Sequence, residues 1–163
     1  MKKLIGQGIS LILLTTAITA FADTDCEPAE GKDLRGCDYS EKNIEDANFR
    51  GANISGVSFK KASLKNANFE EANCHKTNFS HADLEGSSFE AASCSNANFN
   101  KAYLRRVNFE EANLRKAKFR GSDIRKANFI GANLNGANQE QAKRDKGAIF
   151  EKETKKEKAG SSK

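Results

Sequence analysis

A bulky apolar or aromatic residue, or a cysteine, stands at every fifth position of this chain, without interruption from Leu34 to Leu134. The residue two places before it is small in most units, as in Ala47-Asn48-Phe49 and Ala112-Asn113-Leu114. A period of five matches neither the 3.6-residue period of an α-helix nor the two-residue period of a strand. A long tandem repeat of this kind predicts a solenoid, whose stacked units bury a shared core.

These units resemble the A-(D/N)-(L/F)-x-x motif of the pentapeptide repeat family over residues 32–138. The resemblance implies an all-β fold, a right-handed quadrilateral parallel β-helix in which four units make one square coil. It also implies that the bulky and small side chains point inward and that the other three positions point outward. The first units carry Lys32, Cys37 and Lys42 at the small position, which indicates a looser end coil.

The bulky residues alternate between aromatic and aliphatic or Cys, which is the pattern that a four-walled coil with two aromatic walls would produce. Residues twenty apart should then lie one above the other, at the strand spacing of roughly 4.8 Å. One predicted column holds Phe49, Phe69, Phe89, Phe109 and Phe129, and another holds Phe59, Phe79, Phe99 and Phe119. The Asn or Asp between each inward pair is expected to hydrogen-bond the backbone of the turn.

The first residues have the form of a signal peptide. Lys2 and Lys3 precede a mostly apolar run, and Ala20-Phe21-Ala22 fits the A-x-A pattern of a cleavage site. We therefore expect a signal peptide over residues 1–22, no transmembrane segment after its cleavage, and a periplasmic or secreted location.

Two alternatives to cleavage are less well supported. An uncleaved membrane anchor is disfavoured because the apolar run is short and is interrupted by Gln7 and Gly8. Lipid attachment at Cys26 is disfavoured because the polar Asp23-Thr24-Asp25 precedes it.

The segments on either side of the repeat have their own expected roles. Residues 23–31 form an N-terminal lead segment, and residues 139–150 form a C-terminal cap. In that cap, Gln139 to Arg144 is predicted to be a short helix that ends near Gly147, and Ala148-Ile149-Phe150 is predicted to cover the last coil. Residues 151–163 are rich in charge and are expected to be a disordered basic tail.

Export would permit disulfides among the four cysteines. A bond between Cys26 and Cys37 would fasten the lead segment over the open first coil. Cys74 and Cys94 are twenty residues apart on one wall, so they should be stacked neighbours that face inward. Parallel stacked side chains do not naturally give the right-angle torsion of a disulfide, so the sequence favours two reduced thiols there and leaves the bond open.

The net charge of +5 does not describe the body of the chain. The basic surplus lies in Lys2, Lys3 and the segment after Asn138, while residues 23–138 are balanced. Within residues 23–138, acidic and basic residues fall on different sides of the predicted coil. We take two groups as a candidate interaction surface: acidic Glu70, Glu71, Glu90, Glu110 and Glu111, and basic Arg105, Arg106, Arg125 and Lys126. A surface that merely keeps the rod in solution is the plainer interpretation.

No catalytic arrangement is recognisable in the sequence, and neither a cofactor nor a metal site is expected. His75 and His81 lie near Cys74 in sequence, but the fold would point them outward from different walls while Cys74 points inward. We therefore predict a non-enzymatic, exported scaffold or protein-interaction module, whose partner is another protein or an envelope component.

Two other functions stay open. Some members of the family mimic duplex DNA and protect DNA gyrase, but an export signal and a neutral body disfavour that role here, and nucleic acid is an unlikely partner. The chain could also be a secreted effector that acts on another cell. The sequence does not give the oligomeric state.

Overall fold

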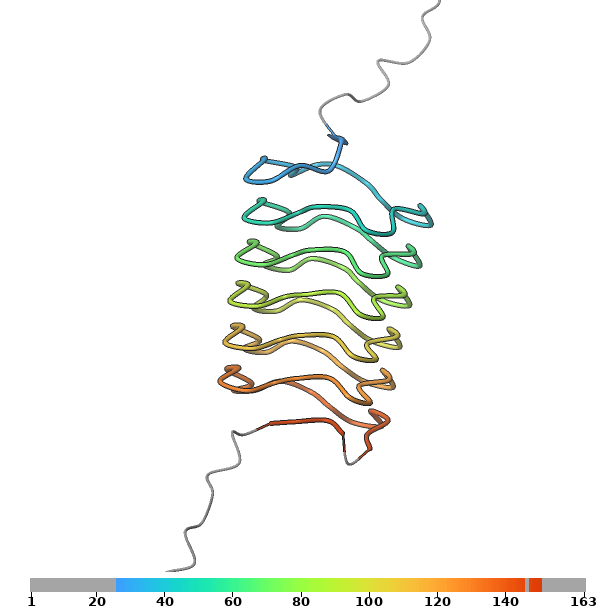
Figure 1. Cartoon of the computed structure of the whole chain (residues 1–163), viewed down its shortest axis with the longest axis vertical. Helices are drawn as coiled ribbons and strands as arrows, with labels where there is room; N and C mark the ends of the chain where they lie inside the picture. Colours follow the sequence, from blue (N-terminus) through green and yellow to red (C-terminus); the bar gives the residue numbers. More distant parts are fainter. Residues whose placement is uncertain (1–25, 146, 151–163) are drawn as a thin grey trace, which may run out of the picture.

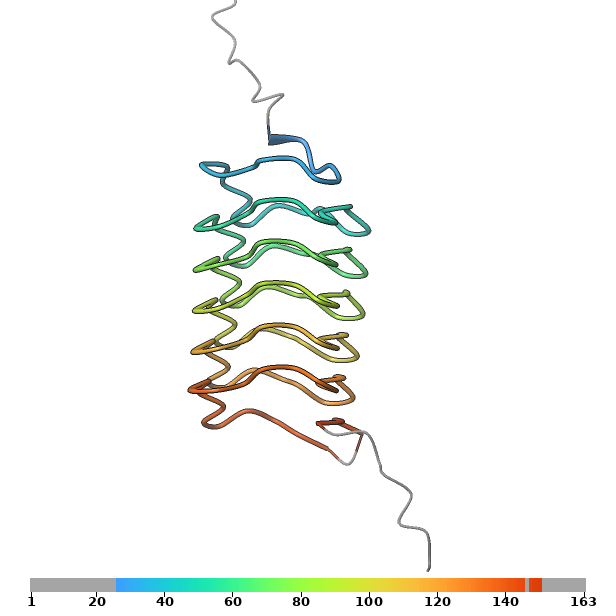
Figure 2. The same ribbon diagram turned by 90° about the vertical axis from the view of Figure 1, so that its left-hand side faces the viewer.

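The computed structural model describes residues 26–145 and 147–150, and the expected signal peptide and basic tail lie outside the described residues. The described chain winds into a stack of similar coils, with its N-terminal end at one end of the rod and its C-terminal end at the other (Figures 1 and 2). It contains no α-helix and no continuous strand in this range, because each five-residue unit contributes one β-bridge between two turns.

The bridges join residues twenty apart in parallel, as in Asn48 with Asn68 and Asn68 with Ser88. Two backbone hydrogen bonds accompany such a bridge: the Phe49 amide donates to the Asn68 carbonyl at 2.7 Å, and the Asn68 amide donates to the Ala47 carbonyl at 2.9 Å. The twenty-residue stacking predicted from the sequence is therefore confirmed, with four units in each coil.

We name the four walls by the bulky residues that point inward from them. Wall A holds Phe49, Phe69, Phe89, Phe109 and Phe129, and wall B holds Leu34, Ile54, Cys74, Cys94, Leu114 and Leu134. Wall C holds Tyr39, Phe59, Phe79, Phe99 and Phe119, and wall D holds Ile44, Leu64, Leu84, Leu104 and Ile124. An edge is named by the two walls that it joins, so the A/B edge carries the turn residues that follow each residue of wall A.

The turns at the edges explain why the chain can change direction every five residues. At the A/B edge, the Ala52 amide donates to the Phe49 carbonyl at 3.0 Å, and Gly51 has a φ of 62°. A turn with a positive φ at its third position normally needs glycine or asparagine. Here most of these positions are not glycine, as with Glu71 and Lys116, so the ladder of hydrogen bonds must hold them in the left-handed region.

The outward Asn and Asp residues of the walls support the turns as expected. The Asn68 side-chain oxygen accepts from the Glu70 amide at 2.8 Å, and the Asn108 oxygen accepts from the Glu110 amide at 3.1 Å. The predicted turn role of these residues is therefore confirmed.

The interior is filled by the two inward positions of each unit. The Phe side chains of walls A and C are at most 2% exposed. Rings of one column stack nearly parallel, for example Phe49 on Phe69 with 4.8 Å between centroids. Rings of the two walls meet edge to face, for example Phe79 with Phe89 at 5.4 Å and 89°. Both arrangements are favourable for aromatic pairs, so the core is a continuous aromatic stack.

The C-terminal end differs from the predicted helical cap. Residues 139–144 continue the coil: Lys143 forms a parallel bridge with Asp123, and Gln139 and Arg144 occupy positions that bulky apolar residues fill elsewhere. A helix there would leave the edge of the last coil without backbone partners, whereas the extra units extend the ladder.

The final described residues cover the last coil, as the sequence predicted for Phe150. One extra residue shifts the register, so Ile149 pairs with Asn128 at a separation of 21. The Phe150 ring then stacks on Phe129 at 4.9 Å, and the Arg144 guanidinium lies 5.2 Å from the Phe150 ring centre. The aromatic column of wall A thus ends under a cation–π contact.

Candidate functional site

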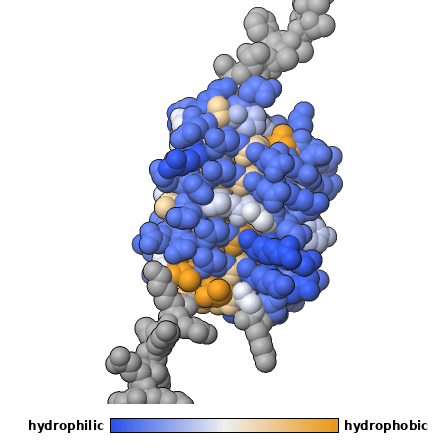
Figure 3. Space-filling model, in the orientation of Figure 1, coloured by the Kyte–Doolittle hydropathy of each residue, from blue (hydrophilic) through white to orange (hydrophobic). Residues whose placement is uncertain are grey.

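The functional groups of this rod lie on its edges, because the inward positions are occupied by packed side chains. The face seen in Figure 3 is mostly hydrophilic with a few small hydrophobic patches. Among the residues that the structure describes, the exposed large hydrophobic side chains are Tyr103 at 58% and Ile149 at 45%. Charge therefore distinguishes one side of the rod from another.

The predicted acidic residues do gather along one edge, the A/B edge. Glu70, Glu90 and Glu110 follow wall A in successive coils, and Glu71 and Glu111 are their neighbours in the turns. The negative charge of the upper part of this edge, which is the part nearer the N-terminus, is reduced by Arg50, which lies 2.5 Å from Glu71 and 3.9 Å from Glu70.

The lower part of the A/B edge, nearer the C-terminus, keeps the negative charge of its acidic residues. Glu90, Glu110 and Glu111 form no ion pair within the described part of the chain. Glu90 accepts a hydrogen bond from the Asn108 side chain at 3.1 Å, and Glu110 accepts one from Asn128 at 3.2 Å. Neutral amides thus orient two of these carboxylates without cancelling their charge.

The predicted basic residues gather along the neighbouring D/A edge. Arg105 lies one coil above Arg125, and Arg106 one coil above Lys126. Two of the four are paired, because Arg106 lies 3.6 Å from Glu85 and Arg125 lies 2.5 Å from Asp123. The structure brings these residues together, but acidic neighbours reduce the net charge of the group.

Asp123, on the outward position of wall D beside this edge, is a buried acidic residue at 8% exposure. The Arg125 side chain donates to both of its oxygens, and this hydrogen bonding lowers the pKa of the Asp123 carboxyl below its usual value, against the opposing effect of burial. The pair is therefore a fixed structural contact that leaves Arg125 less able to bind a partner.

A second basic surface, on wall C, was not named as a site by the sequence interpretation. Lys118 stands on the outward position of wall C where Asp38, Ser58, Asn78 and Asn98 stand in the preceding coils, and it is exposed. Its neighbours at the two edges are Arg115 and Lys116 on one side and Lys101 and Arg120 on the other. The sequence could have identified this residue. Lys118 stands between the small Ala117 and the bulky Phe119, where the five-residue register predicts an outward side chain.

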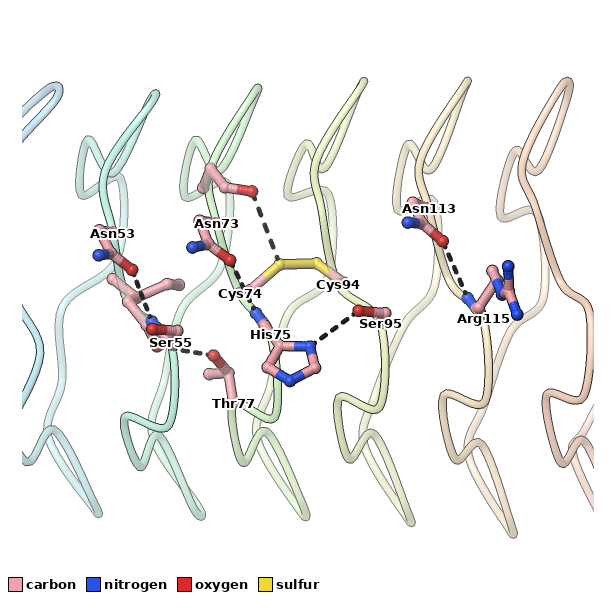
Figure 4. Close-up of a disulfide and its surroundings, with 12 residues drawn as sticks. Asn53, Ser55, Asn73, Cys74, His75, Thr77, Cys94, Ser95, Asn113 and Arg115 are labelled. Carbon is pink, nitrogen blue, oxygen red and sulfur yellow. Dashed lines mark hydrogen bonds between the residues drawn. A yellow bond between two sulfur atoms is a disulfide. The ribbon is translucent and has the colours of Figure 1, made fainter.

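The two cysteine pairs are both bonded in the structure. Cys26 and Cys37 have Cα atoms 5.7 Å apart, so the predicted N-terminal bond is confirmed. Cys74 and Cys94 are also joined, with Cα atoms 4.5 Å apart, which corrects the preference for reduced thiols (Figure 4). Because the two cysteines occupy equivalent positions in adjacent coils, their Cα atoms lie within the range that a disulfide spans, and the side chains rotate enough to meet.

The surroundings of Cys74 do not form a metal centre. The sulfur pair lies inside the coil, whereas the His75 ring lies outside and its Nδ1 is 2.8 Å from the Ser95 hydroxyl (Figure 4). No group of three or more metal-ligating side chains occurs within residues 26–145 and 147–150.

The N-terminal disulfide organises the top of the rod. Cys37 occupies the small inward position of its unit, and its bond to Cys26 draws the lead segment over the first coil. The Tyr39 hydroxyl donates to the Cys26 carbonyl at 2.6 Å, while its ring stacks on Phe59 at 4.8 Å. A groove of about 370 Å³ remains beside this cap, between Pro28 and Ile44.

Comparison with known proteins identifies the family. The description "Pentapeptide repeat region" matches residues 30–99, and "Pentapeptide repeats", in 8 copies, matches residues 102–138. A pentapeptide repeat protein of the Arabidopsis thaliana thylakoid lumen is 31% identical, over 64% of this chain and 70% of that one, with a TM-score of 0.34. The chain belongs to the pentapeptide repeat family.

Two further solved structures are similar to this chain. Rfr23, a pentapeptide repeat protein from the cyanobacterium Cyanothece 51142, is 21% identical over 72% of this chain and 90% of that one, with a TM-score of 0.56. QnrB1, a plasmid-mediated fluoroquinolone resistance protein, is 18% identical over 70% of this chain and 80% of that one, with a TM-score of 0.37. No curated protein matches the sequence.

Proposed function

We propose that this chain is an exported, non-enzymatic scaffold, a right-handed quadrilateral solenoid whose charged edges bind another protein or an envelope component. The observation that carries the proposal is the contrast between a filled core and edges that keep some unpaired charges, such as Glu90, Glu110 and Glu111 within the described residues. Rigid backbone ladders hold the backbone that carries these charges in place, which favours electrostatic recognition with little loss of backbone conformational entropy on binding.

Export is supported by the two disulfides together with the N-terminal sequence. Disulfides persist in oxidising compartments and are rare in the cytosol of ordinary bacteria. Within the described residues, no helix is long and apolar enough to cross a membrane. We therefore propose cleavage after Ala22 and a periplasmic or secreted location for the mature chain.

Fractionation of cells that express a C-terminally tagged chain tests this location. We expect the shortened, oxidised protein in the periplasm or medium. Full-length protein with four free thiols in the cytoplasm would contradict export and would bring the DNA-mimicking alternative forward, which a gyrase supercoiling assay would then decide.

The lower A/B edge is the proposed contact for a protein partner. Glu90, Glu110 and Glu111 are the acidic residues of this edge that no cation neutralises within the described residues. Removing them should reduce the association rate with a basic partner surface, because unpaired charges steer encounter.

A pull-down from envelope extract tests this contact with a charge-matched control. The test variant is Glu90→Gln, Glu110→Gln and Glu111→Gln, and the control is Glu41→Gln, Glu45→Gln and Glu85→Gln, which lie on other edges. The proposal predicts that a captured partner is lost from the test variant and kept by the control. Equal capture by both variants would eliminate the acidic edge as the contact.

A further inference from the structure

Wall C and its two edges carry an uninterrupted positive surface. From Ser55 to Asn138, none of the residues on wall C, the B/C edge or the C/D edge is Asp or Glu. The other charged edges mix both signs: Arg50 binds Glu71 at the A/B edge, and Arg106 binds Glu85 at the D/A edge. Wall C is therefore the side of the described rod with cations and no carboxylates over several coils.

Most cations of this surface are also free of ion pairs. Six exposed side chains form none within the described residues: Lys60, Lys76, Lys101, Arg115, Lys116 and Lys118. Two ion pairs lie at the limits of the surface, Lys61 with Glu41 near the N-terminal end and Arg120 with Glu140 near the C-terminal end. Carboxylates of the folded chain therefore neutralise cations at both ends of the wall C surface. No carboxylate lies on this surface between the two ends.

The shape of the surface is a plane with cations at its borders. The outward residues along its centre are Ser58, Asn78 and Asn98, which are short, followed by Lys118 in the next coil, and they stack in parallel bridges. Long Lys and Arg side chains project from both edges beyond this centre. A shallow hollow of about 480 Å³ opens at the C/D edge, where Gly121 has no side chain between Lys101 and Gln141.

Wall C also lacks the features of a protein-binding hot spot. Strong protein interfaces centre on buried Trp, Tyr or Arg anchors. The exposed large hydrophobics of the described residues, Tyr103 and Ile149, stand on walls D and A. A flat surface with short polar side chains and Lys118 along its centre, and with further cations at its borders, suits a flat and diffuse anionic partner better than a partner that inserts a side chain into a pocket.

We propose that wall C lies flat against an anionic phospholipid bilayer and holds the rod to the membrane surface. This proposal rests on the proposed export to the envelope and is independent of the acidic edge. Each Lys or Arg near an anionic bilayer adds to binding, and the attraction falls off within a Debye length, so the contact needs no inserted apolar residue. Binding through wall C would leave the acidic A/B edge, which borders the opposite wall A, facing away from the membrane.

Vesicle sedimentation tests the proposal on the chain that begins at Asp23, which contains every described residue. The wall variant is Lys101→Gln, Arg115→Gln, Lys116→Gln and Lys118→Gln. The control is Arg105→Gln, Arg106→Gln, Arg125→Gln and Lys126→Gln, which removes the same charge from the D/A edge. Each set changes two positions of positive φ, Lys101 and Lys116 or Arg106 and Lys126, so the backbone cost is matched. Circular dichroism verifies that both variants are folded.

We expect the unchanged chain to sediment with vesicles of phosphatidylglycerol and phosphatidylcholine, to remain in solution with phosphatidylcholine alone, and to be released by salt. The wall variant should partition at least about tenfold more weakly, and the control less than about threefold, because only wall C cations approach the headgroups together. Equal weakening of both variants, binding to phosphatidylcholine alone, or tighter binding to duplex DNA than to the anionic vesicles at the same salt would each overturn the proposal. The vesicle result and the pull-down on the acidic edge fail separately, so each proposal can be rejected alone.

Discussion

The substitution Phe89→Ala tests whether the aromatic stack stabilises the rod. The Phe89 side chain is fully buried and has four ring neighbours. It stacks on Phe69 at 4.6 Å and on Phe109 at 5.1 Å, and it meets Phe79 and Phe99 edge to face at 5.4 Å and 5.6 Å.

The magnitude follows from burial and ring contacts. Truncating a core Phe costs about 3–5 kcal/mol, and aromatic pairs add about 0.5–1.5 kcal/mol each, with incomplete additivity. The stack on both sides of Phe89 restricts collapse into the cavity, so we expect a loss near the upper end, about 5 kcal/mol. Phe150→Ala is the matched control, because the half-buried Phe150 ring has one ring neighbour, Phe129 at 4.9 Å. Its loss should be about 1–2 kcal/mol.

Urea unfolding of the oxidised proteins, followed by far-ultraviolet circular dichroism, measures both values. Stacked repeats can lose cooperativity, so the m-value must be compared along with the midpoint. A cost for Phe89→Ala below about 2 kcal/mol, or equal to that of Phe150→Ala, would refute the claim that the central rings act as one packed stack.

Three further predictions concern the hydrogen bonding of two buried serines, the inner disulfide and the Asp123–Arg125 pair. The Ser87 hydroxyl is buried without a hydrogen-bond partner among the described residues, whereas the Ser122 hydroxyl donates to the Phe119 carbonyl at 2.7 Å. Thermal or urea unfolding should therefore show Ser87→Ala stabilised by about 1 kcal/mol and Ser122→Ala destabilised; the same sign for both would contradict this hydrogen bonding. Replacing Cys74 and Cys94 together by Ala removes a cross-link with a sequence separation of 20, which should cost about 3 kcal/mol in urea unfolding; no change in midpoint would contradict a structural bond. Because Arg125 lowers the pKa of Asp123 in the folded state, the stabilisation from this carboxylate is present above the unfolded pKa of about 3.9 and is lost as pH falls through the lowered folded value. Asp123→Asn should therefore make the unfolding free energy less dependent on pH in that range, and an unchanged pH profile would count against the pair.

The inward half of the fold was predictable from the sequence because the repeat has no insertion from Leu34 to Leu134. The register alone predicts Phe69 over Phe49 and Cys94 over Cys74, and the stacking confirms both. Inward positions are predictable in this way because their volume and polarity are constrained on every side.

The C-terminal end was less predictable because apolar residues no longer mark the inward positions. Gln139 and Arg144 occupy these positions in the last units, near water, where a polar side chain costs little. Their sequence also suits a helix, so local propensity pointed the wrong way, and the backbone ladder with Asp123 decided the outcome.

The candidate surfaces were predicted in part. The five-residue register located the acidic edge and the D/A edge, but it could not show that Arg50 neutralises Glu71 or that Arg125 is held by Asp123. These pairings depend on side-chain rotamers and on contacts between coils. Lys118 was not predicted as a site residue because its position holds Asn, Asp or Ser in most units, where a turn role is expected.

The most direct test of the account is a set of amide and α-proton nuclear Overhauser contacts between residues of successive coils. The account predicts contacts between residues twenty apart along the body, such as Asn48 with Asn68 and Asp123 with Lys143, and a change to 21 for Asn128 with Ile149. An unbroken helical series of contacts three and four residues apart, or a separation that varies from coil to coil between Leu34 and Leu134, would contradict the stacked square coil on which the charged walls depend.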